Sequence, residues 1–302
     1  MILFLFLGFL AGAALVGGVM GWQRQRTRRR LQEMAAQVEA IRVSSLNQRL
    51  SLDAKSGAEA PLLHSLNNLL ARLQNVFESQ RSFVINASHK LRTPLTMITG
   101  QIEVTLIKAR TAEEHEQTWR SVLQDISRLN QLSNDLLELA QLSADRFRLV
   151  PQPVALDEVI YQAGAKLKAR RPSYQIKLEF APQLDELDGP LTVPGDAHLL
   201  EQAFLHLLEN GCKFSPDRQV RVELGLDAEH AVLQFQDHGS GIAAPELPRI
   251  FEPFFRGANA RQVPGHGIGL ALVQGVMQLH QGSIEVAPAP EVGTTFIVRL
   301  PL

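Results

Sequence analysis

The apolar and polar positions in the first half of the chain repeat with the period of an α-helix. Three- and four-residue spacing begins in an apolar series at Leu62, Leu63, Leu66, Leu69, Leu70 and Leu73. It continues through Val76, Val84, Ala87, Leu91, Leu95, Ile98 and Ile102. After a turn expected at Thr111–Glu116, it resumes at Val122, Ile126, Leu129, Leu132, Leu136 and Leu139. This pattern predicts a helical hairpin, and we expect a homodimer in which two hairpins bury their apolar faces as a four-helix bundle.

The pattern changes after Leu149 to a mixture of helical and strand periods. Helices are predicted over 156–169, 197–213 and 272–280. Strands are predicted over 175–180, 220–226, 231–236, 283–286 and 295–300. Strands joined by short turns favour an antiparallel or mixed sheet with helices on one face, which is the α+β class.

The first segment is apolar throughout, since Met1–Trp22 contains no charged residue. As a helix it would be roughly 33 Å long, enough to cross a hydrocarbon core of about 30 Å. Five arginines follow within eight residues, at Arg24, Arg26, Arg28, Arg29 and Arg30. By the positive-inside rule they place the rest of the chain in the cytoplasm. We expect a single-pass anchor in a bacterial inner membrane rather than a signal peptide, which would need a basic start and a shorter apolar stretch.

Between the anchor and the hairpin, two helical stretches are separated by a break. Leu31–Arg42 is amphipathic, and a connector containing Gly57 is expected over 53–59. Two short helices joined in this way could relay motion from the membrane, although a plain coiled-coil stalk fits the same pattern. The expected domains are therefore a transmembrane helix (1–22), a linker (23–75), a dimerisation hairpin (76–148) and an α+β domain (149–302). With almost nothing before the span, we expect no extracytoplasmic domain, and a membrane sensory protein is a candidate partner.

Composition and charge narrow the range of partners. The 302 residues have a formal net charge of -1, so there is no bulk electrostatic basis for binding nucleic acid. The single cysteine, Cys212, excludes an internal disulfide and cannot by itself form a metal site. A reducing, cytoplasmic setting fits most of the chain.

One histidine on the first arm of the predicted hairpin faces water. His89 lies about 120–200° around the helix from the apolar series, taking about 100° per residue. Pro94 removes the amide that would donate to the Lys90 carbonyl and should bend the helix there. An exposed histidine on a helix usually has no function, so its meaning depends on whether the chain also carries a phosphoryl donor site.

Two motifs in the second half carry polar residues suited to a nucleotide. "HLLENGCKFSP" ends a helix with Asn210 and Lys213 one turn apart. A neutral amide oxygen suits Mg²⁺, and a lysine suits phosphate. "DHGSGI" places Asp237 at the end of an apolar strand, before Gly239 and Gly241. A carboxylate there can accept a hydrogen bond from an exocyclic amine such as adenine N6, and glycines let the backbone approach closely.

Further motifs follow in a fixed order. "GHGIGL" places Gly265, Gly267 and Gly269 at a helix start, where amides and the helix dipole favour phosphate. A Rossmann interpretation fails, because a loop with Pro264 leads into this motif where that fold has a strand. "FEPFFRG" is an aromatic cluster in a long loop, and "GTTF" begins at Gly293. Each motif alone is weak, but their order is specific.

The chain resembles a sensor histidine kinase of the two-component type. "FVINASHKLRTPLTMI" resembles the H-box of that family, "HLLENGCKFSP" its N-box, "DHGSGI" its G1 box, "FEPFF" its F-box and "GHGIGL" its G2 box. The resemblance covers about Leu73 to the C-terminus, and residues 31–72 are similar to a HAMP relay. It implies an all-α dimeric hairpin followed by an α+β sandwich with the Bergerat ATP-binding fold. ATP and Mg²⁺ are the implied cofactors, and a response regulator with a receiver domain is the implied partner.

The resemblance also implies roles for individual residues. His89 would be phosphorylated from ATP and would pass the phosphoryl group to an aspartate of the response regulator, and Thr93 would help to dephosphorylate that partner. Asn210 would hold Mg²⁺, Lys213 the phosphates and Asp237 the adenine. The other residues expected at the nucleotide are Phe214, Gly239, Gly241, Ile242, Phe254, Gly265, Gly267, Gly269, Leu270 and Thr294.

Two positions depart from the family pattern. The family usually has an acidic residue directly after the histidine, where this chain has Lys90, and often an asparagine where this chain has His206. Lys90, counted among the catalytic residues, favours one alternative: an autokinase-impaired regulatory protein, or a phosphatase acting on the response regulator. A Bergerat ATPase of the gyrase or chaperone type is a second alternative. It would carry a glutamate in place of His206 and would lack a histidine hairpin.

Overall fold

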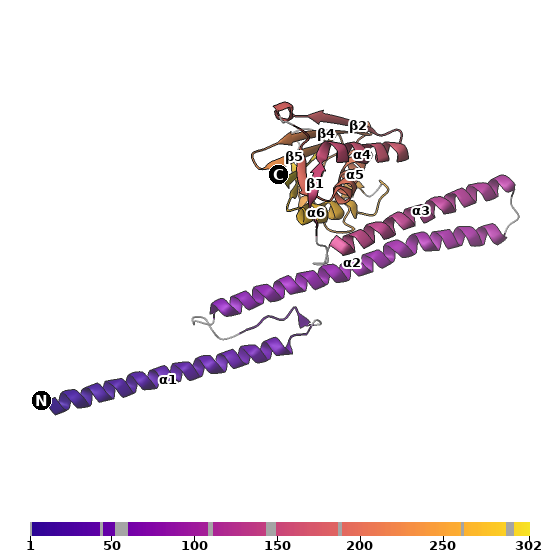
Figure 1. Ribbon diagram of the computed structural model, residues 1–302. Helices are drawn as coiled ribbons and strands as arrows, with labels where there is room; N and C mark the ends of the chain where they lie inside the picture. The colour runs from indigo at the N-terminus through magenta and orange to yellow at the C-terminus, as the bar shows by residue number, and fades with distance from the viewer. Residues whose placement is uncertain are drawn as a thin grey trace. The chain divides into compact units, whose positions relative to one another are not determined.

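The computed structural model describes residues 2–42, 45–51, 60–107, 111–142, 149–186, 189–260, 263–287 and 293–302. The chain divides into two compact units, Met1–Ile85 and Asn86–Leu302. Figure 1 shows the helices and strands of each unit.

The first unit contains helix α1 (Ile2–Ala40) and the beginning of helix α2 (Ala60–Ile107). Within the part of the chain that the structure describes, no helix is both long and apolar enough to cross a membrane. The predicted transmembrane helix over 1–22 is therefore not confirmed by the structure, and the side chains of residues 1–14 lie outside its described part. The predicted helix Leu31–Arg42 corresponds to the last turns of α1, which ends at Ala40.

A non-helical segment, residues 45–51, binds both α1 and α2. The Leu50 amide donates to Asn67 Oδ1 at 2.9 Å, and Asn67 Nδ2 donates to the Leu50 carbonyl at 3.0 Å. Gln37 of α1 makes a similar pair of hydrogen bonds with the amide and carbonyl of Ser51, both at 3.2 Å. The connector predicted over 53–59 lies outside the described residues, but these bonds show that the segment just before it lies along both helices.

In the second unit, α2 continues and pairs with α3 (Ala112–Leu142) as the predicted hairpin (Figure 1). Gln101 of α2 contacts Ser121 and Asp125 of α3, at 3.5 and 3.4 Å. The predicted turn at Thr111–Glu116 is wrong in extent, because α3 begins at Ala112. Thr111 and Glu114 cap its first turn reciprocally: the Glu114 amide donates to Thr111 Oγ1 at 3.3 Å, and the Thr111 amide donates to Glu114 Oε2 at 2.9 Å.

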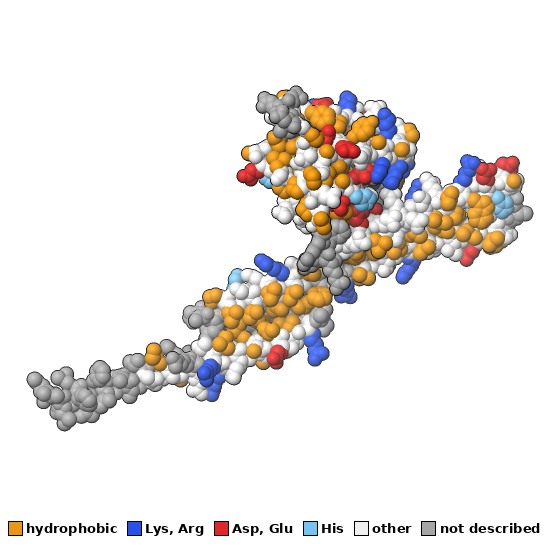
Figure 2. All heavy atoms as spheres, in the orientation of Figure 1, with side chains coloured by type: hydrophobic (Ala, Val, Ile, Leu, Met, Phe, Trp, Pro, Cys, Tyr) orange, Lys and Arg blue, Asp and Glu red, His pale blue; other side chains and the backbone are white. Residues whose placement is uncertain are grey.

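The apolar faces of the hairpin are only partly covered within one chain. Ile98, Val122 and Leu132 are buried, whereas exposed apolar side chains include Leu95, Met97, Trp119, Leu123, Ile126 and Leu137. Figure 2 shows apolar side chains gathered in bands along the long helices. A second apolar surface is needed to cover such a face, which agrees with the expectation of a bundle.

The rest of the second unit is the predicted α+β domain. Its helices are α4 (Leu156–Arg170), α5 (Ala197–Phe214) and α6 (Gly269–Leu279). Its main sheet has the order β2-β4-β5-β7-β6, with strands β2 (Gln175–Phe180), β4 (Gln219–Leu226), β5 (His230–Asp237), β6 (Ser283–Ala287) and β7 (Thr294–Pro301). β2 runs parallel to β4, and the other pairs are antiparallel. The prediction of an antiparallel or mixed sheet is confirmed.

A second, two-stranded sheet was not predicted. β1 (Gln152–Ala155) and β3 (Thr192–Gly195) pair antiparallel, with Val154 opposite Val193. Each strand has only four residues, so neither shows a clear alternating pattern in the sequence.

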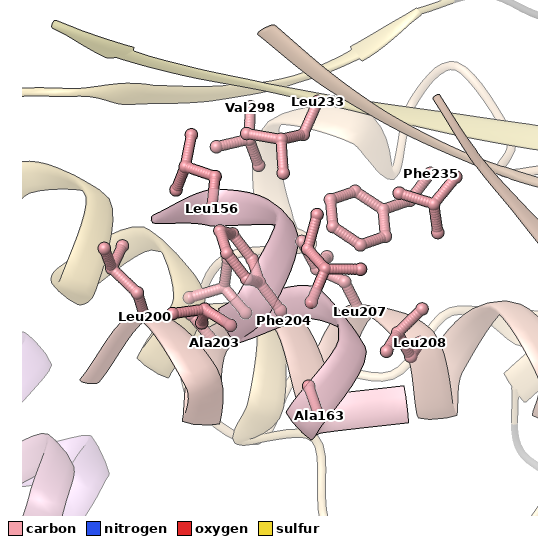
Figure 3. Close-up of a cluster of buried hydrophobic side chains, with 14 of the residues drawn as sticks. Leu156, Ala163, Leu200, Ala203, Phe204, Leu207, Leu208, Leu233, Phe235 and Val298 are labelled. Carbon is pink, nitrogen blue, oxygen red and sulfur yellow. The ribbon is translucent and has the colours of Figure 1, made fainter. Parts of the chain in front are cut away.

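The core lies between the main sheet and its helices. Alternate residues of β5 and β7 are buried, so one face of the sheet is covered. Figure 3 shows how Phe204 and Leu207 of α5 point toward Leu233 and Phe235 of β5 and Val298 of β7. The rings of Phe204 and Phe235 are 5.9 Å apart between centroids. This packing fixes α5 against β5, and both elements carry predicted site residues at their ends.

Candidate functional site

The carboxylate of Asp237 is buried at the end of β5. Its Oδ1 accepts hydrogen bonds from the backbone amides of Gly239 at 2.7 Å and of Thr294 at 3.1 Å. Burial raises the pKa of Asp237, and the two amides oppose that rise. A carboxylate held in this way has a fixed direction and can accept a hydrogen bond from an amine of a ligand.

Glycines surround Asp237 because the neighbouring backbone leaves no room for a side chain. A Cβ on Gly239 would lie 2.8 Å from Asp237 Oδ1 and 2.9 Å from the Phe214 carbonyl oxygen. Gly293 has a φ of +145°, and a Cβ there would overlap the Asp237 carbonyl oxygen. Gly293, the first residue of "GTTF", is therefore a site residue that the motif itself could have revealed.

The last turn of α5 carries Asn210, Lys213 and Phe214. Lys213 reaches the loop before α6, since a Cβ on Gly265 would lie 2.6 Å from Lys213 Nζ. Nζ is also 5.3 Å from the centroid of the Phe214 ring. Burial lowers the pKa of Lys213, and the negative charge of Glu209 opposes this change. A cation partly withdrawn from water, beside a glycine-rich loop, is suited to binding phosphate.

The aromatic motif and the last glycine motif contact each other. The Phe254 amide donates to the Gly267 carbonyl at 2.7 Å, and Gly267 has a φ of +78°. Arg256 donates from Nη1 to the Gly265 carbonyl at 2.9 Å and from Nη2 to the carbonyls of Ala260 and Val263. The loop between β5 and α6 is thus closed on itself by Arg256, which the sequence pattern did not single out.

Helix α6 begins at Gly269 and Leu270, directly after that loop. A Cβ on Gly269 would lie 3.1 Å from His206 Nδ1, so the imidazole of His206 packs against the helix start. Burial lowers the pKa of His206 to about 4. The imidazole is therefore neutral at neutral pH, and it adds no charge where the amides of α6 favour phosphate.

His89, Lys90 and Thr93 all lie on α2. His89 is exposed, as predicted, whereas Lys90 is partly buried. Thr93 Oγ1 donates to the His89 carbonyl at 3.1 Å, one turn back along the helix. Pro94 lies within the same helix. The imidazole of His89 is therefore open to an approaching phosphoryl donor.

Lys90 also influences a residue of the glycine motif "GHGIGL". Burial lowers the pKa of His266, and the positive charges of Lys90, Lys213 and Arg256 lower it further. The cation next to His89 therefore acts on the same region as the cations beside the glycine-rich loop.

Three polar residues beside these motifs form a group that was not predicted. The His238 amide donates to Ser215 Oγ at 2.9 Å, and His238 Nδ1 lies 3.0 Å from Asp217 Oδ2. Asp217 Oδ1 accepts from the Gln219 amide at 3.0 Å. Hydrogen bonds from His238 and Ser215 hold the pKa of Asp217 below its ordinary value. The only signal in the sequence is that Ser215 and His238 lie within two of the motifs and that Asp217 directly follows one of them.

Most of the predicted nucleotide-binding residues thus contact another residue of the same set. Ile242 and Leu270 instead pack against the hydrophobic core, and Gly241 packs near the Gly293 carbonyl. In the described part of the chain, no group of three or more His, Cys, Asp or Glu side chains could hold a metal ion. Asn210 offers a single neutral amide oxygen, which fits Mg²⁺ when phosphates and water supply its other ligands.

Two family models match the chain. Residues 79–145, which include His89, match the His Kinase A (phospho-acceptor) domain. Residues 195–302, which include Lys213 and Asp237, match the histidine kinase-, DNA gyrase B- and HSP90-like ATPase.

Curated relatives match nearly the whole chain. It is 31% identical to sensor protein IrlS of Burkholderia pseudomallei over 274 residues, which are 90% of this chain and 58% of that protein. It is 32% identical to the histidine-protein kinase/phosphatase MprB of Mycobacterium avium over an alignment of 306 positions, which covers 97% of this chain and 56% of that protein. The chain therefore spans little more than half the length of these relatives.

A similar fold is found in a solved structure, the histidine kinase ThkA in complex with the response regulator protein TrrA. The TM-score is 0.56 at 19% identity, over 81% of this chain and 64% of that one. With a phosphoacceptor hairpin, an ATPase domain after it and sensor kinase relatives across most of its length, the chain belongs to the family of two-component sensor histidine kinases.

Proposed function

We propose that this chain is an ATP-dependent protein-histidine kinase that phosphorylates His89 and passes the phosphoryl group to an aspartate of a response regulator. The observation that carries the proposal is the arrangement around the end of β5. There a buried carboxylate, Asp237, lies near the end of α5, whose Lys213 meets the glycine-rich loop. The same chain presents an exposed histidine on its phosphoacceptor hairpin.

The residues present fit ATP with Mg²⁺. Asp237 would accept a hydrogen bond from the adenine amine, because the backbone amides that donate to its Oδ1 hold the carboxylate in a fixed direction. Lys213 and the amides at the start of α6 would bind the phosphates. Asn210 would hold Mg²⁺. Phe214 and Phe254 would line the nucleotide on its apolar side.

When bound, ATP supplies the phosphoryl group and Mg²⁺ offsets its charge. His89 would act through a neutral ring nitrogen, which forms an N–P bond as the bond between phosphorus and the ADP oxygen breaks. The ring must then lose a proton from its other nitrogen. Lys90 cannot accept that proton while it is protonated, so the proton passes to water or to a carboxylate from elsewhere.

The partner would be a response regulator with a receiver domain, as TrrA is for ThkA in the solved complex. Thr93 would assist dephosphorylation of that partner, a second activity that the kinase/phosphatase name of MprB supports. The exposed apolar side chains on the hairpin support a homodimer in which two hairpins form a four-helix bundle.

An impaired kinase that mainly acts as a phosphatase is the second candidate. Lys90 favours it, because a cation next to the phosphorylated histidine cannot serve as the base. The intact geometry around Asp237 and Lys213 favours the kinase.

We also propose that residues 1–22 anchor the chain in the bacterial inner membrane, with the catalytic part in the cytoplasm. The absence of charge over Met1–Trp22 and the arginines after it support this topology. Residues 23–75 would form a HAMP-like linker, which the hydrogen bonds of segment 45–51 to both α1 and α2 support. The hairpin would extend over 76–148 and the catalytic domain over 149–302.

Incubation of the chain with ATP labelled on its γ-phosphate tests the proposal. A kinase retains label that is stable to base and labile to acid, and His89→Ala removes it. Release of free phosphate without labelled protein would indicate an ATPase. If neither labelled protein nor free phosphate is found, the phosphatase remains the candidate function. Dephosphorylation of a phosphorylated response regulator would then test it directly.

A further inference from the structure

Three residues outside the nucleotide-binding set connect its two halves. Ser215 is the residue that caps the end of α5, Asp217 lies in the loop after it, and His238 lies between Asp237 and Gly239. Ser215 is buried, whereas Asp217 and His238 are exposed. We refer to Ser215, Asp217 and His238 as the tie.

The hydrogen bonds of the tie form a closed set. Ser215 Oγ accepts from the His238 amide at 2.9 Å and also hydrogen-bonds the Asp217 carboxylate. The single hydroxyl proton of Ser215 must therefore point at Asp217. An ionised carboxylate only accepts, so His238 Nδ1, which is 3.0 Å from Asp217 Oδ2, carries the proton of that bond. Each member of the tie thus orients the other two.

Two members of the tie lie next to the residues proposed to bind the phosphates and the adenine. Lys213 is two residues before Ser215, and Asp237 directly precedes His238. The Phe214 carbonyl oxygen already lies close to Gly239, because a Cβ there would be 2.9 Å from it. Val220, at the start of β4, pairs with Asp237 in the sheet. The tie therefore holds the end of α5 against the turn that follows Asp237.

We infer that Ser215, Asp217 and His238 are positioning residues, which set the nucleotide affinity by fixing Asp237 relative to Lys213. They act through these two residues and need not touch the nucleotide. The inference rests on the proposed function, since it assumes that Asp237 and Lys213 bind opposite ends of the nucleotide. Because His89 lies on another element, loss of the tie should weaken binding and leave the rate at saturating ATP unchanged.

The chain contains a matched control at the other end of β5. His230 Nδ1 lies 3.2 Å from Asp227 Oδ1, and the His230 amide donates to the same oxygen at 2.9 Å. This pair also joins an imidazole to a carboxylate in a partly exposed turn. It closes the β4–β5 turn and, among the residues that the structure describes, makes no bond to α5, so it reports the cost of losing such a pair away from the nucleotide.

The experiment is a titration of the full chain with ADP and Mg²⁺. We expect His238→Ala to weaken ADP binding about three- to tenfold, the range expected for one lost hydrogen bond. His238→Asn should bind nearly as the unsubstituted chain does, because its amide nitrogen can take the place of Nδ1 and donate to Asp217. His230→Ala should leave the affinity unchanged. In the autophosphorylation assay, His238→Ala should raise the KM for ATP by the same factor without changing kcat.

Asp237→Asn in the same titration separates the two levels of the argument. If Asp237→Asn binds ADP normally, the proposed nucleotide site is wrong and the tie has no role in it. If Asp237→Asn weakens binding but His238→Ala behaves like His230→Ala, the nucleotide site stands and the tie does not position it. A His238→Asn variant as weak as His238→Ala would also overturn the inference. Should His238→Ala fail to fold, Asp217→Ala removes the acceptor of the same bond and takes its place.

Discussion

The amide of Thr294 donates to Asp237 Oδ1 at 3.1 Å, although the two residues are 57 positions apart. Asp237 ends β5 and Thr294 begins β7, and these strands pair with Asp237 opposite Thr294. The carboxylate proposed to bind adenine is thus oriented by the last strand of the domain as well as by its own turn.

Asp237→Asn should weaken nucleotide binding about ten- to a hundredfold. A charge-assisted hydrogen bond contributes roughly 1.5–3 kcal/mol, and an asparagine can turn its NH₂ group toward the adenine amine, donor against donor. Titration with ADP measures the change, and Asp227→Asn at the other end of β5 is the control. Equal affinities for the two variants would show that adenine binds elsewhere.

Lys90→Glu should raise the rate of autophosphorylation at saturating ATP. A positioned carboxylate can accept the proton that the imidazole loses, and such a base contributes about 10²–10⁴ in rate. Lys90→Met is the control, since it removes the positive charge without adding a base. If Lys90→Glu leaves the rate unchanged or lowers it, the lysine is an adapted part of the mechanism.

Gly293→Ala should destabilise the catalytic domain and weaken nucleotide binding together. Its φ of +145° is strained for alanine, and the new Cβ would overlap the Asp237 carbonyl oxygen. Backbone strain of this kind costs about 1–3 kcal/mol. Gly164→Ala in α4 is the control, because its Cβ would meet Ile176 Cδ1 at an ordinary 3.4 Å. Urea unfolding measures the difference, and equal stability of the two variants would contradict it.

His206 should make the stability of the domain depend on pH. Its pKa in the folded chain is about 4, below the ordinary 6.5, because burial disfavours the charged form. As pH falls, His206 is therefore protonated in the unfolded chain before it is protonated in the folded one. Its contribution to the free energy of unfolding is complete above pH 6.5 and is lost as pH falls toward 4. Burial raises the pKa of Asp135 to about 7, so the effect of Asp135 on the pH dependence of stability has the opposite sign.

The comparison of the unsubstituted chain with His206→Asn isolates this effect, since Asp135 is present in both. As pH falls from 7.5 to 5, the free energy of unfolding of the unsubstituted chain should decrease relative to that of His206→Asn. A difference that stays constant with pH would show that His206 is protonated as easily in the folded chain as in the unfolded one.

Local patterns were enough to predict most helices and strands of the catalytic domain. β2 has the predicted bounds, and α4 differs by one residue at its end. Periodicity works here because each element is long enough for its buried face to repeat within contiguous residues. The motif residues could be named for the same reason, since Asp237, Lys213 and the glycines stand at recognisable ends of those elements. The start of α3 was misplaced because a cap, Thr111 with Glu114, overrode the polar appearance of its first turn.

The sequence by itself determined which side chains are available for the chemistry, and the tertiary structure decided which of them meet. The pairing of β1 with β3, the bond from Thr294 to Asp237 and the contact of His238 with Asp217 all join residues that are more than 20 positions apart. Such contacts depend on the path of the chain between them, which no local period records. The neutral state of His206 has the same origin, because its pKa is set by the surfaces that bury it.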